Sequence, residues 1–421
     1  DVSLLCRDAE PAVQAREAFR SYLEDEWLAF RSSLEGRVGS FSSVPLSWMP
    51  APSRLFVRNA FEPGGDVCEF TLCMVKLAVI GTGGMARHQV ESFQKIENCC
   101  VVAACDIVES RVAEFAKQYG IAAVYSDVDA LLAEVECDAV TVVAPDAFHH
   151  PLTMKAIAAG KHVLCEKPLA LNAKDALEMS VAAKQAGVIN MVNFSYRNSS
   201  AIQMAAQLAS SGALGTVRHV HAYYLQSWLA QDQWGFWETS PQWLWRLSTK
   251  AGSMGVLGDV GVHILDFAGM PVGPYRSVNC KLKTFGKGDG NRMGDYDLDA
   301  NDTAIITAEF ANGALATIHT TRWAQPHVNS LRLNVYGDKA SIEIELDESY
   351  STLKISRLLG RQAMPWELLD CGATPTNFER FIASVETGVQ DQADFARGAE
   401  IQGVLDACFE SDRDDKTVAV S

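Results

Sequence analysis

The segment 76–86 reads Lys-Leu-Ala-Val-Ile-Gly-Thr-Gly-Gly-Met-Ala and limits what this chain of 421 residues can fold into more than any other feature. The apolar run before its first glycine predicts a parallel strand covered on both faces. Gly81 permits a tight turn, and Gly83 lets a pyrophosphate approach the backbone. Gly84 and Ala86 are small enough for a following helix to pack on the sheet. The N-terminus of that helix would hold phosphates through its free N–H groups and its dipole.

An acidic residue ends the second predicted strand, 101–105. Asp106 stands where a carboxylate binds the ribose 2′-hydroxyl of a dinucleotide. It would repel a 2′-phosphate, which favours NAD, although Arg111 is close enough in sequence to leave NADP open. Thr82 and Met85 lie within the glycine turn and complete the expected phosphate-binding loop. The alternatives are a glycine turn without a nucleotide, or a Rossmann domain for another adenosine ligand.

Length and composition favour a globular protein of two domains. Hydrophobic residues make up 48% and charged residues 21% of the chain. The formal charge of −16 argues against nucleic acid and against an anionic membrane surface as partners. No apolar run reaches the roughly 20 residues of a membrane helix, and no signal peptide is visible, so we expect a cytoplasmic protein. The eleven cysteines show no disulfide pattern, and those near predicted strands are expected to be buried reduced thiols.

The chain divides into three expected parts. Residues 1–73 are an N-terminal extension, with an amphipathic helix predicted over 10–30. This extension is either foreign to a native protein that starts at Met74, or an arm that packs on a partner. Residues 74–196 form the predicted dinucleotide-binding domain, and residues 197–421 form a second domain for substrate binding and oligomerisation.

Strands and helices alternate in the first of these domains, which predicts a doubly wound parallel sheet. Its expected strands are 75–80, 101–105, 124–125, 139–143, 162–165 and 188–194. The second domain is predicted to be α+β, with a largely antiparallel open sheet. Its expected strands are 217–226, 302–310, 314–321, 330–335 and 340–345, and its expected helices are 254–268, 376–387 and 393–410. The Gly- and Asp-rich stretch 286–301 reads as a mobile loop.

Lys167 follows a predicted strand, at the sheet edge where ligands bind. A lysine that is partly desolvated or near another cation has a lowered pKa and can exchange protons. The alternative is a salt bridge with Glu166. Asp259 and His263 are four residues apart and would share one face of a helix. The imidazole suits a general base and the carboxylate suits positioning of the substrate or the lysine, whereas a helix acid beside a core histidine is the alternative.

These motifs resemble the Gfo/Idh/MocA family, the glucose–fructose oxidoreductase and inositol dehydrogenase group, over about residues 74–420. The resemblance is carried by Ala-Gly-Lys-His-Val before Glu166-Lys167-Pro168, by Asp-x-Gly-x-His over 259–263, by Trp245-Arg246, and by the last helix at 398–411. It implies an NAD(P)-dependent dehydrogenase acting on CH–OH groups. Such an enzyme transfers a hydride between a nicotinamide and a sugar, cyclitol or related polyol.

The resemblance also implies roles for single residues. Lys167 orients the reacting hydroxyl and assists proton transfer, and Asp259 and His263 complete the catalytic set. The same three residues, with Trp245 and Arg246, would contact the substrate.

On the cofactor side, the resemblance implies support from Glu166 and from the stretch Ala144-Pro145-Asp146 with His149. Asp146 departs from the family, in which many members carry Asn there. Arg197 is expected near the cofactor or substrate, with an interdomain salt bridge as the alternative.

Two further features have competing interpretations. Adjacent helical residues such as His149 and His150 diverge by about 100°, so we expect no metal site. Tryptophans cluster over 228–245 and would form either a wall against sugar C–H surfaces or a core or subunit interface. Their positions are Trp228, Trp234, Trp237, Trp243 and Trp245.

The sequence thus predicts an NAD-linked sugar or polyol oxidoreductase that forms a dimer or tetramer. Two rival functions remain. One is a glycosidase that uses bound NAD transiently, as one branch of the family implies. The other is a non-catalytic NAD(P)-binding sensor.

Overall fold

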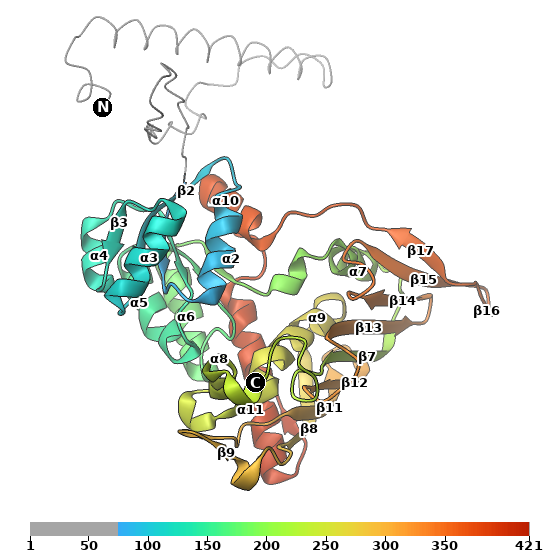
Figure 1. The fold of residues 1–421 in the computed structure, drawn as a ribbon. Coiled ribbons are helices and arrows are strands. Elements are labelled where there is room, and N and C mark those ends of the chain that lie inside the picture. The colour runs from blue at the N-terminus through green and yellow to red at the C-terminus, as the bar shows by residue number, and fades with distance from the viewer. Residues whose placement is uncertain (1–74, 421) are drawn as a thin grey trace, which may run out of the picture. The chain divides into compact units, whose positions relative to one another are not determined.

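The structure, a computed structural model, describes residues 75–420. The predictions for residues 1–73 and for Met74 lie outside the described residues. The first half contains six parallel strands in the order β3-β2-β1-β4-β5-β6 (Figure 1). The strands are β1 (Val75–Ile80), β2 (Cys99–Cys105), β3 (Ala123–Tyr125), β4 (Ala139–Val142), β5 (His162–Cys165) and β6 (Asn190–Val192). This is the doubly wound order in which ligands bind beyond the carboxyl ends of the strands.

Helices cover both faces of this sheet. They are α2 (Gly84–Phe93), α3 (Glu109–Tyr119), α4 (Val128–Glu134), α5 (His149–Ala158) and α6 (Ala173–Ala186). Ala78 and Ile80 of β1 belong to one core cluster, whereas Val79 between them belongs to another that includes Phe115 of α3. Because alternate side chains of β1 are buried on opposite faces, the strand is apolar except for Lys76, whose Nζ pairs with Glu136 at 3.0 Å.

The caps of α6 also follow the sequence. The side chain of Asn172 accepts a hydrogen bond from the amide of Asp175, and Gly187 ends the helix at φ +65°. Both residues suit these positions, since Asn is a favoured N-cap and only glycine adopts a left-handed backbone without strain.

The second half is built on a ten-stranded sheet with the order β16-β15-β14-β13-β7-β12-β11-β8-β18, with β17 also paired to β15. The strands are β7 (Val217–Gln226), β8 (Tyr275–Lys283), β11 (Thr303–Phe310), β12 (Leu315–Thr321), β13 (Asn329–Gly337), β14 (Ala340–Glu345), β15 (Thr352–Leu359), β16 (Gln362–Ala363), β17 (Glu367–Asp370) and β18 (Val418–Ala419). Only the β7–β12 pair is parallel among these pairs of the described chain. The predicted, largely antiparallel sheet is therefore confirmed.

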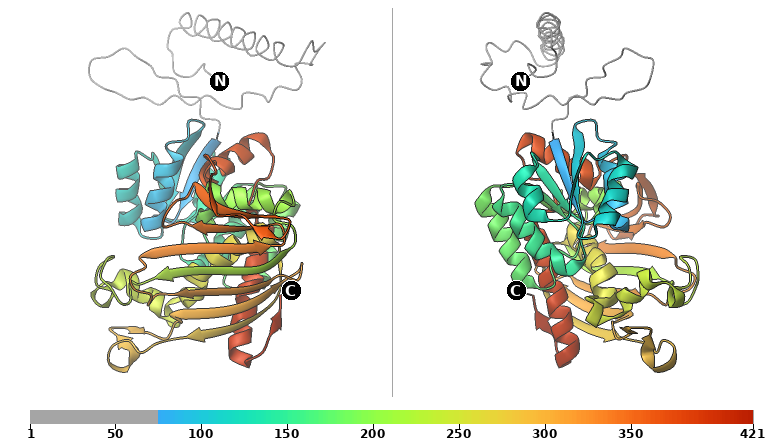
Figure 2. Two further views of the ribbon diagram at one scale, coloured as in Figure 1. Left: turned by 90° about the vertical axis from the view of Figure 1, so that its right-hand side faces the viewer. Right: turned by 60° about the vertical axis from the view of Figure 1, so that its left-hand side comes forward.

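Helices line one face of this sheet, while its long strands present the other face in Figure 2 (left). The helices are α7 (Ser200–Ser210), α9 (Val262–Val272) and α11 (Phe395–Asp414). Helix α11 contacts both α6 and β8. Helix α10 (Asn377–Thr387) packs on α2 and β1, so that Phe381 lies in a cluster with Leu77. The last two helices therefore tie the two sheets together, and the domain boundary near residue 196 stays a prediction.

Three expectations differ from the structure. Strands β8, β15 and β17 were not predicted, because they are edge or near-edge strands with many exposed positions. The stretch 286–301 is anchored rather than a simple loop, since Lys287 forms an ion pair of 2.7 Å with Asp302 and both side chains are fully buried. Among the cysteines, Cys105, Cys137 and Cys165 are buried free thiols as expected, but Cys100 is disulfide-bonded.

Candidate active site

The glycine turn lies between β1 and α2. Gly81 has φ +96°, and a β-carbon there would lie 2.5 Å from the carbonyl oxygen of Val143 on the neighbouring strand, so no other residue fits. A β-carbon on Gly83 or Gly84 would meet nothing within 4 Å. The predicted packing role of Gly84 is therefore wrong, whereas Ala86 is fully buried as expected. The open space at Gly83 and Gly84, before a helix with no acidic residue in its first turn, fits a bound pyrophosphate.

Asp106 closes this loop from the end of β2. Its carboxylate accepts hydrogen bonds from the amide and the hydroxyl of Thr82, at 2.9 and 2.8 Å, and from the amide of Val108 at 3.0 Å. Arg111 lies 3.4 Å from the same carboxylate. Burial raises the pKa of Asp106, but these hydrogen bonds and Arg111 outweigh it and hold the pKa below its ordinary value. Asp106 is thus a fixed anion beside the glycine turn.

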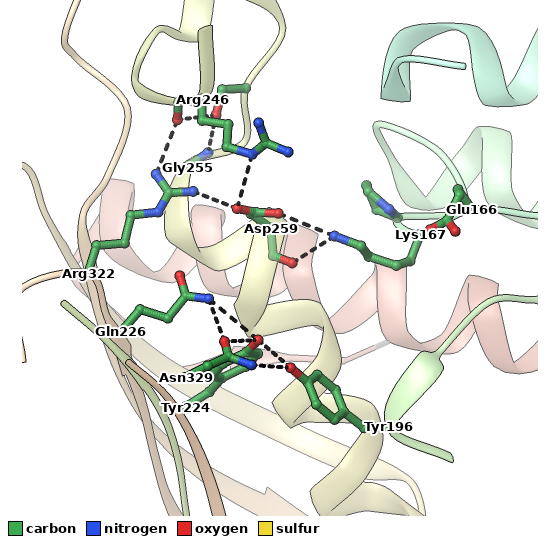
Figure 3. A network of polar contacts seen from close by, with 12 residues as sticks. Glu166, Lys167, Tyr196, Tyr224, Gln226, Arg246, Gly255, Asp259, Arg322 and Asn329 are labelled. Carbon is green, nitrogen blue, oxygen red and sulfur yellow. Dashed lines mark hydrogen bonds and ion pairs between the residues drawn. The ribbon is translucent and has the colours of Figure 1, made fainter. Parts of the chain in front are cut away.

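Lys167 and Asp259 meet across the two halves of the chain (Figure 3). Lys167 follows β5, and its Nζ donates to Oδ1 of Asp259 at 3.2 Å and to the Asp259 carbonyl oxygen at 3.0 Å. The alternative salt bridge with Glu166 is wrong. The buried Glu166 carboxylate instead accepts from Gln89 at 2.7 Å and from Asn193 at 2.8 Å.

Two arginines reach the other carboxylate oxygen of Asp259. Nη2 of Arg322 lies 2.9 Å from Oδ2, and Nε of Arg246 lies 3.8 Å from it. Burial raises the pKa of Asp259, but Lys167 and then the two arginines outweigh this and hold the pKa far below its ordinary value. Asp259 therefore remains ionised at every pH at which the protein would work.

The pKa of Lys167 moves opposite to the expectation. Burial lowers it, but the carboxylates of Asp259, Glu166 and Asp146 together raise it above its ordinary value. The expected lowering is thus wrong, because the lysine faces carboxylates rather than a second cation. Lys167 is a protonated donor in this site.

His263 is buried, and its ring meets the Tyr196 ring edge to face at 5.0 Å between centroids. Its Nδ1 has no hydrogen-bond partner among the described residues. Burial and then the charge of Lys167 lower the pKa of His263 to about 3, against the opposite effect of Asp259 and Asp266. The imidazole is therefore neutral at pH 7 and can accept a proton.

Asp259 and His263 do not share an ordinary helical turn. Asp259 lies in a π-helical turn, η8 (Leu257–Gly261), and His263 lies in the α-helix that follows it. Such wide turns recur at functional sites because they re-aim one side chain. The predicted helix over 254–268 is confirmed from 262 onward and replaced by this turn before it.

The stretch after β4 turns through η3 (Asp146–Phe148) into α5. Both ring nitrogens of the buried His149 lie near carbonyl oxygens, that of Pro168 at 2.7 Å and that of Ala144 at 2.9 Å. His149 therefore joins the end of β4 to the segment that carries Lys167. Burial raises the pKa of Asp146, against the charges of His149 and Lys167.

Arg197, in the turn η4 (Ser195–Asn198), does not reach the glycine turn. Its Nε and Nη2 bind the two carboxylate oxygens of Asp266 at 2.7 and 2.6 Å, and its Nη1 donates to Gln392 at 2.6 Å. The cofactor contact predicted for Arg197 is thus wrong, because its guanidinium is used within the protein. The alternative was an interdomain salt bridge; a salt bridge is present, but Arg197 and Asp266 both lie in the predicted second domain.

The tryptophan cluster is mainly core. Trp228 and Trp237 are buried, and the rings of Trp228 and Trp243 lie 5.5 Å apart. Arg246 stacks on Trp245 at 4.5 Å from its ring centroid and also pairs with Asp259, which brings both predicted substrate contacts near the carboxylate.

Sequence reasoning missed several residues of this site. Arg322 follows β12, and the only signal was a charged residue directly after an alternating strand. A second group links Tyr196, Tyr224, Gln226 and Asn329 through hydrogen bonds below Asp259 in Figure 3. Its members come from η4 and from strands β7 and β13, so no local pattern marks it.

Comparison with known proteins agrees with this arrangement. Residues 75–194 match a family model described as the oxidoreductase family with an NAD-binding Rossmann fold, and residues 202–343 match the GFO/IDH/MocA C-terminal domain. An uncharacterised oxidoreductase from Synechocystis is 30% identical over 64% of this chain and 71% of its own length. D-glucoside 3-dehydrogenase from Escherichia coli is 28% identical over 80% of this chain and 95% of its own length.

Levoglucosan dehydrogenase from Pseudarthrobacter phenanthrenivorans is 29% identical over 55% of this chain, and the match spans 61% of that relative, less than two thirds. Among solved structures, a levoglucosan dehydrogenase with NADH and levoglucosan has a TM-score of 0.74 at 23% identity, covering 82% of this chain and 99% of its own. An oxidoreductase domain protein from Kribbella flavida has a TM-score of 0.74 at 27% identity, with the same coverage. The chain therefore belongs to the Gfo/Idh/MocA family of NAD-binding oxidoreductases.

Proposed function

We propose that the protein is an NAD-dependent dehydrogenase that oxidises a CH–OH group of a sugar, cyclitol or related polyol. The observation that carries the proposal is the meeting of Lys167 from the dinucleotide-binding half with Asp259 from the other half, at 3.2 Å. His263 lies on the helix that follows Asp259, and the charge of Lys167 helps to lower the pKa of its imidazole. The sugar dehydrogenases among the relatives support the same substrate class.

The charge state of each of these three residues suits it to a different role in the reaction. Protonated Lys167 is a donor that would hold the oxygen of the reacting hydroxyl, and ionised Asp259 would fix the lysine. Neutral His263 would accept the hydroxyl proton. NAD, when bound, supplies the hydride acceptor. The protein would supply orientation, which is a large part of such a rate enhancement.

The residues proposed to hold NAD surround the glycine turn. Gly83 and Gly84 leave room for the pyrophosphate, and Asp106 would bind the adenine ribose. Its ionised carboxylate supports NAD over NADP because it would repel a 2′-phosphate, whereas Arg111, 3.4 Å away, is the residue that could bind one. The proposed set also keeps Thr82, Met85, Ala144, Pro145, Asp146, His149 and Glu166.

Substrate selectivity would come from the segment 226–250. Arg246, stacked on Trp245 and 3.8 Å from Asp259, is the part of this segment placed at the proposed site. A cavity of about 550 Å³ lies in the same segment, lined by Leu229, Ala230, Gln231, Asp232, Gln233, Phe236, Trp237 and Glu238.

The test is a screen of sugars and polyols that follows NADH absorbance, with NADP in parallel, on the wild type and on Lys167→Ala. We expect the variant to lose about 10²–10⁴-fold in kcat, as when a positioned proton donor is removed. Lys174→Ala is the matched control, since this lysine is exposed on α6. Full turnover by Lys167→Ala would refute the assignment.

The same screen separates the rival functions. A glycosidase that uses NAD transiently would cleave glycosides, retain the cofactor tightly and form no net NADH. A sensor would bind NAD without turnover across the whole panel.

We also infer a cytoplasmic homo-oligomer. The buried free thiols of Cys105, Cys137 and Cys165 suit a reducing compartment, whereas the disulfide at Cys100 does not. The described residues contain no helix long and apolar enough to cross a membrane. Ile305 and Leu315, which are 59% and 57% exposed on the ten-stranded sheet, suit contact with a second copy. Light scattering of the purified chain tests the assembly, and a monomer at micromolar concentration would refute it.

A further inference from the structure

Arg322 is a fully buried arginine beside the proposed catalytic carboxylate. Its backbone amide donates to the carbonyl oxygen of Asp302 at 3.0 Å, which fixes it at the end of β12. Its Nη1 donates to the carbonyl oxygen of Arg246 at 3.1 Å, and its guanidinium lies 5.0 Å from the centroid of the Trp228 ring. With no exposed surface, the side chain reaches Asp259 but offers no face to a substrate, so any effect on the reaction must pass through Asp259.

The two oxygens of Asp259 are divided between partners. Oδ1 accepts from Lys167 at 3.2 Å, and Oδ2 accepts from Arg322 at 2.9 Å. Arg246 also lies on the Oδ2 side, but at 3.8 Å and with 31% of its side chain exposed. The planar guanidinium of Arg322 is rigid and donates from both terminal nitrogens, Nη1 to Arg246 and Nη2 to Asp259, so it can hold the orientation of the Asp259 carboxylate. Lysine, by contrast, binds as a point charge and imposes no plane.

Seven titratable or charged groups interact with Asp259 from the elements around it. They are Lys167 after β5, Arg246 in η6 (Trp245–Leu247), Arg322 after β12, His263 in α9, Asp146 in η3, Tyr196 in η4 and Tyr224 in β7. Without the charge of Arg322, the main counter-charge of Asp259 would be Lys167. The carboxylate could then turn both oxygens toward the amine and compete with a hydroxyl for its protons.

We propose that Arg322 is a positioning residue: it holds Oδ2 of Asp259, so that only Oδ1 meets Lys167 and the amine keeps a donor for the substrate. The kinetic consequences rest on the proposed function. The effect on Lys167 itself does not, because it follows from the three side chains alone.

The first test therefore needs no substrate. The full chain is labelled with acetic anhydride over a range of pH, and acetylation of Lys167 is followed by peptide mass spectrometry. In Arg322→Gln a nearby positive charge is lost, and Asp259 keeps only Lys167 and the more distant Arg246 as counter-charges. Lys167 should then titrate about one unit or more higher than in the wild type and react more slowly at a given pH. Arg322→Lys should titrate like the wild type, and so should Arg276→Gln, which removes an exposed arginine of β8.

The second test is kinetic, with a substrate from the screen. Arg322→Gln should lose about 10- to 100-fold in kcat with little change in KM, since the reacting geometry is disturbed and binding is not. The acid limb of its pH profile should move to higher pH, because the loss of a buried positive charge makes protonation of the base His263 easier. Arg322→Lys should restore the pH profile because it returns the positive charge. It should restore only part of kcat, because an ammonium group lacks the planar guanidinium that orients the Asp259 carboxylate.

Melting temperature and NAD binding show whether each variant is folded. If Arg322→Gln does not fold, Arg322→Lys tests the proposal instead. A Lys167 titration like that of the wild type together with a reduced kcat supports the proposal. A kcat equal to that of the wild type overturns it. Unchanged Lys167 titration in folded Arg322→Gln also overturns it. So does a loss of kcat with an unmoved pH profile, which would mean a structural role only. If no substrate turns over, the proposed function fails while the labelling result still decides this inference.

Discussion

At the scale of single residues, the site is defined by which charge each side chain carries. Lys167 keeps its proton, Asp259 stays ionised and His263 stays neutral, and each state results from neighbours on other elements. The residue types were visible in the sequence, and so was their chemistry. The direction of the lysine pKa was not, because it depends on three carboxylates that the fold gathers around it.

The depressed pKa of His263 predicts an acid-sensitive fold. The unfolded chain takes up a proton near pH 6.5, whereas the folded chain does so only near pH 3. Between these values the unfolded state binds more protons, so stability is full above pH 6.5 and falls as the pH is lowered toward 3. By this residue alone, the free energy of unfolding should drop by about 2 kcal/mol between pH 7.5 and pH 5.

The variant His263→Gln removes this titration while keeping a polar side chain. Urea unfolding of the wild type and the variant at both pH values isolates the effect, since all other groups are shared. The variant should lose about 2 kcal/mol less than the wild type over this interval. Equal losses in the two proteins would show that His263 is not held neutral.

At the scale of elements, the ends of strands and the starts of helices set the site. The turn after β1 requires glycine at position 81, because a β-carbon there would lie 2.5 Å from the carbonyl oxygen of Val143. Asp259 lies in the wide π-helical turn η8 directly before α9, so its side chain and that of His263 are not related by an ordinary α-helical turn. These terminal geometries, rather than the regular parts of the elements, decide where the reactive atoms lie.

Two glycines of the turn provide a matched pair for testing this. Gly81→Ala places a β-carbon 2.5 Å from a backbone oxygen at φ +96°, so it should destabilise the protein by about 1–3 kcal/mol from backbone strain alone. Gly84→Ala lies in the first turn of α2 with open space around it and should be neutral or stabilising by up to about 1 kcal/mol. Denaturant unfolding of both variants checks the prediction, and similar stabilities would contradict it.

At the scale of the whole molecule, a buried ion network joins the turn η4 and the helices α9 and α11. Asp266 of α9 binds Arg197 of η4 through both carboxylate oxygens and also accepts from Nε of Arg397 of α11 at 2.8 Å. Burial raises the pKa of Asp266, but Arg197 and then Arg397 outweigh this and lower the pKa to about 2. The network therefore holds the helix that carries His263 against α11 and against the turn η4 that follows the first sheet.

Removing this charge should be costly. Asp266→Asn would leave two buried arginines without their shared carboxylate, and we expect a loss of about 3–5 kcal/mol in the free energy of unfolding. Glu367→Gln breaks an ion pair of 2.7 Å with Arg357 whose side chains are 65% and 50% exposed, and it should cost at most about 1 kcal/mol. Thermal and denaturant unfolding compare the two. A loss at Asp266 as small as at Glu367 would mean that the network contributes little to holding η4, α9 and α11 together.

The sequence by itself determined the features that depend on local pattern. The bounds of β1, β5, β7 and β14 follow from apolar runs or alternation, and the N-cap of α6 follows from Asn172. Lys167, Asp259 and His263 were recognisable because their motifs are contiguous. Only the tertiary structure decided the rest. Arg197 binds Asp266 instead of a cofactor, and Arg322 joins Asp259, because charges 60 or more residues apart are paired by strand order and helix packing, which leave no mark in any short stretch of sequence.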